Sequence, residues 1–188
     1  GGSGELLLRC TEDELAWTRE TLGPGGWAAI NPGAAFGSAK RWIPSRFAEV
    51  GERIAREFGL SILLTGGPGE VDLGREIEEA MTVKPLNLIG KTSVRKMMAL
   101  LSMCRLMVTN DSGPMHVAAA FSIPTVALFG STDHTTTSPL TSRFRIVRKD
   151  TECAPCLKRQ CSTDHRCMTG ITVEDVMEAV QGIMSVEA

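Results

Sequence analysis

Short apolar segments alternate with amphipathic helical segments along most of this chain, and this alternation limits the possible folds more than any other feature. Five apolar segments each run into a turn of glycine or polar residues: residues 27–30, 60–65, 86–89, 106–109 and 125–129. Between them, apolar residues recur at helical spacing, as they do from Phe47 to Phe58 before Gly59. Because both faces of the predicted strands are apolar, we expect helices on both sides of a parallel sheet. The sequence therefore predicts an α/β fold with a doubly wound parallel sheet.

The same pattern divides the chain into three parts. Residues 1–26 combine a Gly-rich start, which is either a linker or a remnant of cloning, with a helix opened by a capping-box sequence at Thr11. Residues 27–150 form the Rossmann-like core, to which residues 144–147 add a last strand. Residues 151–188 hold a cysteine-rich loop and a final helix of the same domain.

Composition argues against several classes of function. The chain has 20 Lys and Arg against 22 Asp and Glu, so its net charge of −2 offers no overall attraction to nucleic acid. Its 43% hydrophobic and 22% charged residues are typical of a globular protein. No apolar run reaches the ~18–20 residues that a membrane-spanning helix needs, and the start lacks a signal peptide. We therefore expect no nucleic-acid partner, no membrane span and no secretion.

Ligands of doubly wound sheets bind beyond the carboxyl ends of the strands, and three loops at such positions are informative. In the first, residues 31–42, small residues let backbone N–H groups approach an anion, and Lys40 with Arg41 adds positive charge. In the second, residues 65–70, Glu70 is suited to accept hydrogen bonds from sugar hydroxyls. Taken alone, the first loop is also explained as an ordinary Gly-rich connection. The alternative for Glu70 is that its negative charge only stabilises the N-terminus of a helix.

The third loop, residues 109–116, runs from a strand into a helix that begins near Pro114. The free N–H groups around Ser112 and Gly113, together with the helix dipole, form a phosphate site, and His116 can donate to the same phosphate. The alternative is that Asp111 or Ser112 only caps the helix and that His116 is a surface residue.

Three familiar fingerprints are absent from the sequence. Pro85 occupies the first glycine position of a Walker A motif that would end at Gly90-Lys91-Thr92. No G-x-G-x-x-G follows the first strand, and no G-x-S-x-G is present. These absences disfavour a P-loop, a nicotinamide dinucleotide site and an α/β-hydrolase.

Four cysteines follow the core in the pattern C-x2-C-x4-C-x5-C, at Cys153, Cys156, Cys161 and Cys167, with His165 inside it. The spacing is close to that of short zinc modules, and it also permits a redox pair at the first two thiols. Free, partly buried thiols are the third interpretation. The residues leave these alternatives open, so we assign no metal and no cofactor.

The three loops together resemble those of glycosyltransferase family 9, the ADP-heptose:lipopolysaccharide heptosyltransferases, and most of all its heptosyltransferase II subgroup. The resemblance rests on residues 33–42, 65–70 and 110–116, and residues 153–168 share it. It implies the GT-B fold, with two Rossmann-like halves around a cleft. This chain is similar to the C-terminal half, which binds the nucleotide sugar, whereas the catalytic carboxylate and the acceptor surface belong to the N-terminal half.

The resemblance also implies a role for each candidate residue. Lys40 would be the catalytic cation that neutralises the departing diphosphate, and Asp111 would hold the heptose hydroxyls. The remaining contacts would go to the ribose (Glu70), to the adenine (Thr92) and to the phosphates (Ser112, Gly113 and His116).

By this resemblance the chain is the ADP-heptose-binding domain of an inverting heptosyltransferase of lipopolysaccharide inner-core synthesis. The full enzyme would act in the cytoplasm, at the inner face of the inner membrane, on a lipid-linked core acceptor bound by the other half. The chain alone is then expected to be inactive, because the general base lies in that half. The alternatives are a nucleotide or nucleotide-sugar binding module without a transferase role, and a metal or redox adaptor built around the cysteines.

Overall fold

A computed structural model describes residues 8–139 and 141–185, so the prediction for Gly1 to Gly4 lies outside the described residues. Its centre is a sheet of six parallel strands in the order β3-β2-β1-β4-β5-β6. The strands are β1 (Trp27–Asn31), β2 (Ser61–Leu64), β3 (Leu86–Asn87), β4 (Leu106–Asn110), β5 (Thr125–Phe129) and β6 (Phe144–Arg148). The predicted doubly wound parallel sheet is confirmed.

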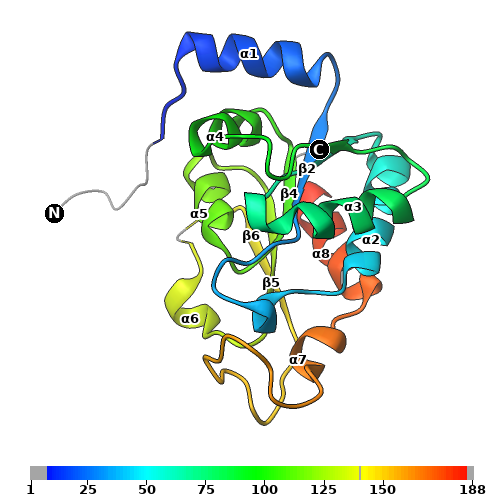
Figure 1. The fold of residues 1–188 in the computed structure, drawn as a ribbon, viewed down its shortest axis with the longest axis vertical. Helices are drawn as coiled ribbons and strands as arrows, with labels where there is room; N and C mark the ends of the chain where they lie inside the picture. The colour runs from blue at the N-terminus through cyan, green and yellow to red at the C-terminus, as the bar shows by residue number, and fades with distance from the viewer. Residues whose placement is uncertain (1–7, 140, 186–188) are drawn as a thin grey trace, which may run out of the picture.

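Helices cover both faces of the sheet (Figure 1). One layer contains α2 (Pro44–Phe58), α3 (Val71–Ala80) and α8 (Val173–Met184), and the other contains α1 (Glu12–Leu22), α4 (Val94–Ser102) and α5 (Gly113–Ala120). Two single-turn helices, α6 (His134–Thr137) and α7 (Arg166–Thr169), follow β5 and the cysteine-rich loop. They are too short to show a helical period in the sequence.

The alternation of side chains along β1 separates two apolar layers. Ala28 and Ile30 pack into the cluster beneath α2 and α8, whereas Ala29 packs with Leu100 and Leu101 on the other side. All five side chains are fully buried. Each buried Leu or Ile stabilises the fold by about 1.5–3 kcal/mol, so the sheet is a rigid base for the loops at its carboxyl edge.

Capping residues set several helix ends as the sequence predicts. Thr11 and Glu14 form a capping box at α1, and Gly59 ends α2 in the left-handed region at φ 65°. Of the two candidate caps for α4, Ser93 is the one used, because its side chain accepts from the Lys96 N–H at 3.2 Å. Thr92 is therefore left outside the cap.

The third strand is shorter than the predicted 86–89. Its ladder continues through the Leu88 N–H, which donates to the Leu64 carbonyl at 3.0 Å, and the chain then turns at Gly90 with φ 74°. Within residues 8–139 and 141–185, no helix is long and apolar enough to cross a lipid bilayer.

Candidate functional site

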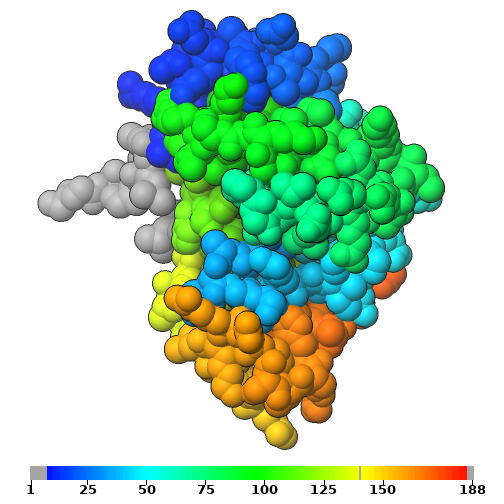
Figure 2. Space-filling view, viewed as in Figure 1, coloured from blue at the N-terminus to red at the C-terminus, as the bar shows by residue number. Residues whose placement is uncertain are grey.

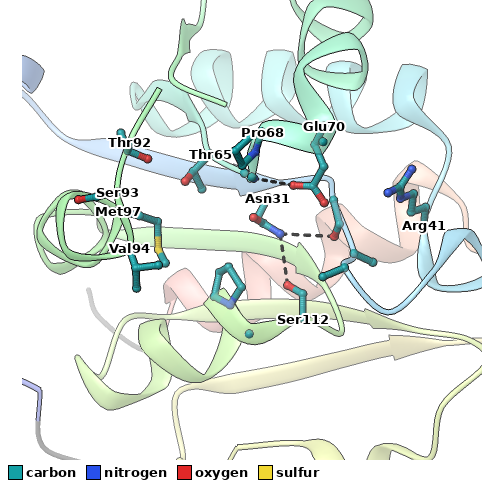
Figure 3. Close-up of a pocket in the computed structure, with 18 residues that line it drawn as sticks. Asn31, Arg41, Thr65, Pro68, Glu70, Thr92, Ser93, Val94, Met97 and Ser112 are labelled. Carbon is teal, nitrogen blue, oxygen red and sulfur yellow. Dashed lines mark hydrogen bonds between the residues drawn. The ribbon is translucent and has the colours of Figure 1, made fainter. Parts of the chain in front are cut away.

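A pocket of about 600 Å³ lies at the carboxyl ends of the strands (Figure 3). Its walls come from the loops after β1, β2 and β3 and from the N-terminus of α5. The volume is in the range of small-molecule sites, and the position is where ligands of doubly wound sheets bind. Of the seven residues predicted to form the site, four line this pocket: Glu70, Thr92, Ser112 and Gly113.

The first loop of the pocket is held to the sheet by one buried amide. The Asn110 side chain donates to the Pro32 carbonyl at 2.7 Å and accepts from the Trp42 N–H at 3.2 Å. The Trp42 indole, itself buried, donates to the Ile171 carbonyl at 3.0 Å. Both ends of the loop that carries Lys40 are therefore fixed to the core.

Glu70 enters the pocket because residue 33 has no side chain. One carboxylate oxygen of Glu70 accepts from the Gly67 N–H at 2.8 Å. A Cβ added to Gly33 would lie 1.9 Å from the other oxygen, so any larger residue would displace the carboxylate. Gly33 thus makes room for an acceptor that faces the pocket, and the contact of Glu70 to a sugar hydroxyl stays a prediction.

The N-terminus of α5 borders the pocket as predicted. Ser112 occupies the N-cap position, but its side chain makes no capping hydrogen bond. Instead, the Ser112 hydroxyl accepts from the Asn31 side chain at 3.2 Å and is 3.1 Å from the Thr109 hydroxyl. The first-turn N–H groups of a helix have no intrahelical partner and carry the positive end of the dipole, so this end of α5 can bind an anion.

Lys40 and Asp111 lie beside the pocket and contact each other. The Lys40 ammonium is 2.7 Å from the Asp111 carboxylate, and the two side chains are 11% and 5% exposed. The Thr132 hydroxyl donates to the same carboxylate oxygen. Asp111 is therefore not the cap of α5, and its carboxylate is held by a cation rather than facing the helix N-terminus. The roles predicted for the two residues toward diphosphate and heptose stay predictions.

Two buried polar atoms in the pocket wall have no hydrogen-bond partner within the described part of the chain. They are the Arg41 Nε and the Thr65 Oγ. An unpaired buried polar group costs about 1–3 kcal/mol, so these atoms favour a polar ligand in the pocket. The charge of Arg41 is evident from the sequence, but its place in the pocket is not, because spacing does not give the direction of a side chain along an irregular loop.

The far end of the pocket is more apolar. Thr92 lies there with Val94 and Met97, which come from the first turns of α4 (Figure 3). Val94 is 69% exposed, which leaves apolar surface for a flat ring. His116 is exposed on α5 and, like Lys40 and Asp111, does not line the pocket.

A second, smaller cavity of about 50 Å³ is lined by the four clustered cysteines and His165. Hydrogen bonds from Thr163 lower the pKa of the Cys161 thiol, whereas burial and the neighbouring thiols raise that of Cys167. All six cysteines are free thiols. Among the described residues, no three His, Cys, Asp or Glu side chains are grouped so that they could hold a metal ion.

The sequence matches a known protein family. The family model described as Glycosyltransferase family 9 (heptosyltransferase) matches residues 7–166. The chain belongs to glycosyltransferase family 9. It is 36% identical over 160 residues to lipooligosaccharide heptosyltransferase 2 of Campylobacter jejuni, covering 82% of this chain and 50% of that protein. It is 33% identical over 189 residues to lipopolysaccharide heptosyltransferase 2 of Salmonella typhimurium, covering 98% and 52%.

Solved structures of the family share the fold. The structure of the Escherichia coli ADP-heptose lipopolysaccharide heptosyltransferase II matches with a TM-score of 0.80 and 31% identity, over 97% of this chain and 54% of that one. The family 9 glycosyltransferase of Veillonella parvula matches with a TM-score of 0.86 and 26% identity, over 100% and 55%. This family 9 chain thus spans about half the length of the relatives it matches.

Proposed function

We propose that this chain is the ADP-heptose-binding half of an inverting heptosyltransferase of lipopolysaccharide biosynthesis. Family membership supports the transferase class, and the heptosyltransferase 2 relatives support the heptosyl donor and the lipopolysaccharide acceptor. In this proposal the acceptor is bound by a second half at the cytoplasmic face of the inner membrane.

The observation that carries the proposal is the pocket with its unpaired polar atoms. A nucleoside diphosphate supplies acceptor oxygens for the Arg41 guanidinium and the Thr65 hydroxyl, and its charge suits the N-terminus of α5. Its ribose hydroxyls suit the Glu70 carboxylate, and its base suits the apolar end at Val94. One ligand would then use every side of the pocket.

Transfer adds a requirement that binding does not have. Negative charge grows on the departing diphosphate in the transition state, so a cation beside it lowers the barrier. Lys40 is the candidate, and its partner Asp111 keeps the ammonium in place until the donor arrives. When phosphate oxygens approach Lys40, Asp111 is available to heptose hydroxyls, for which a carboxylate is a strong acceptor.

The attacking hydroxyl needs a general base, and in this proposal the base comes from the other half. The chain alone would therefore bind the donor without transferring it. Transfer that returns on mixing with an N-terminal half would separate a transferase domain from a simple binding module.

Calorimetric titration of the chain with ADP, UDP and GDP tests the proposal. We expect ADP to bind and to bind more tightly than UDP or GDP, because the base lies in a pocket of defined shape. Arg41→Ala should weaken ADP by about tenfold or more, the scale of one charge-assisted hydrogen bond. Arg75→Ala is the matched control, because Arg75 is an exposed arginine of α3 outside the pocket. Equal affinity for the three nucleotides, or none for any, would overturn the proposal.

A further inference from the structure

The cysteine-rich segment, residues 153–165, lies directly against the loop that carries Lys40. Figure 2 shows the two segments side by side, the loop in light blue and the segment in orange. The segment is anchored in its first half and just beyond its end. The Leu157 N–H donates to the Ser131 carbonyl at 2.7 Å, and Cys167 and Met168, just beyond the segment, are buried in the core. The segment therefore connects the core of the domain to the Lys40 loop.

Two hydrogen bonds join the segment to Ala39, the residue just before Lys40. The Ala39 N–H donates to the Arg159 carbonyl at 3.0 Å, and the His165 Nε2–H donates to the Ala39 carbonyl at 2.9 Å. Ala39 is buried, with 2% of its surface exposed. Both backbone groups that precede Lys40 are therefore held from outside the loop, by residues more than 100 positions away.

A glycine lets the two segments approach this closely. Gly37 has φ 158°, in the region that side chains rarely adopt, and a Cβ there would lie 2.1 Å from the Arg159 carbonyl oxygen. The contact is backbone against backbone, so it sets the path of the loop and not only the position of one side chain.

Two cation–π contacts to Phe36 add a third connection. The Phe36 ring has the Lys40 ammonium 4.9 Å from its centroid and the Arg159 guanidinium 5.2 Å from it. Cation–π contacts at such distances contribute about 0.5–1 kcal/mol at exposed sites. The Lys40 side chain, which has many rotamers, is thereby restrained by Phe36 as well as by Asp111.

We propose that the segment of residues 153–165 is a positioning element for donor binding, and that it acts through His165 and Arg159 on the Lys40 loop. This inference rests on the proposed function of the pocket. A displacement of about 1 Å in a group that stabilises charge can cost as much as a hundredfold in rate, so a loop with a catalytic cation needs such support. Three of the four clustered cysteines, Cys153, Cys156 and Cys161, belong to this element.

The test compares ADP with adenosine, because a positioning role for the Lys40 loop concerns the phosphates and not the base. His165→Asn removes the reach to Ala39 while tolerating the left-handed backbone at this residue, whose φ is 58°. We expect His165→Asn to lower the affinity for ADP by about tenfold and to leave the affinity for adenosine unchanged. His165→Gln, which restores an N–H donor of similar reach, should recover most of the ADP affinity. Gln160→Ala is the matched control, an exposed residue of the same segment.

Hydrogen exchange gives a second measurement that needs no ligand. In His165→Asn the amides of residues 36–41 should exchange at least tenfold faster, while those of β4 keep their rates. If His165→Asn keeps the wild-type exchange rates and ADP affinity while Lys40→Met no longer binds ADP, the positioning role is wrong and the proposed function stands. If the wild-type chain binds no ADP, the proposed function fails, and the positioning role fails with it.

Discussion

Glu52, on α2, offers the sharpest test of how this chain is held together. Its carboxylate is buried, with 6% of the residue exposed, and accepts from four donors. These are the hydroxyl and N–H of Thr82, the Val83 N–H at 2.9 Å, and the Arg56 guanidinium at 2.7 Å. The donors, the Thr82 hydroxyl most of all, lower the pKa of Glu52 from 4.5 to about 2, although burial alone would raise it. One side chain thus joins α2 to the chain that leads from α3 to β3.

The difference between the folded and unfolded pKa of Glu52 gives its contribution to the free energy of unfolding. A difference between 4.5 and about 2, at about 1.4 kcal/mol per pKa unit, corresponds to about 3 kcal/mol. Because the folded pKa is the lower one, the stabilisation is complete above pH 4.5. It is lost progressively as the pH falls below about 4.5, and it is gone only below about 2, where the carboxylate is protonated in both states.

Urea unfolding of Glu52→Gln from pH 7 to pH 3 measures this contribution. At pH 7 the variant should be about 3 kcal/mol less stable than the wild type, and the gap should narrow as the pH falls below 4.5. Glu49→Gln, an exposed position on the same helix, should change stability by less than about 0.5 kcal/mol. A gap of the same size at pH 7 and pH 3 would show that lost packing, and not the charge of Glu52, causes the effect.

Three further predictions concern the pocket. In an enzyme reconstituted with its other half, Lys40→Ala should lower turnover by about a hundredfold or more, because the cation acts on charge that forms in the transition state. An effect confined to the Michaelis constant would instead assign Lys40 to uniform binding. Asp111→Asn should lower the affinity for ADP-heptose while leaving the affinity for ADP nearly unchanged. Equal losses of affinity for the two ligands, measured by calorimetry, would refute a contact between Asp111 and the sugar. Gly33→Ala should displace the Glu70 carboxylate and lower the affinity for ADP as much as Glu70→Ala does. If the double variant bound ADP more weakly than either single variant, the two substitutions would not act through the same carboxylate.

The sequence by itself determined the architecture and the place of the binding loops. Short apolar runs and helical patterns are local, and so are caps such as Thr11 and turn residues such as Gly59. Each element could therefore be predicted from its own residues. Parallel strands with apolar faces require helices on both sides, which brings their carboxyl ends to one edge. The predicted loops therefore had to meet there, and Glu70, Thr92, Ser112 and Gly113 do line one pocket.

Only the tertiary structure decided which of these side chains contact each other. Lys40 pairs with Asp111 across 71 residues, and His165 reaches Ala39 across 126. Arg41, in an irregular loop, turns its side chain into the pocket wall, and exposed His116 does not line it. No periodicity governs such loops, so the direction of each side chain depends on which neighbours the strand order brings within a few ångströms. These contacts join residues far apart in the chain, and they form only when the whole sheet is assembled.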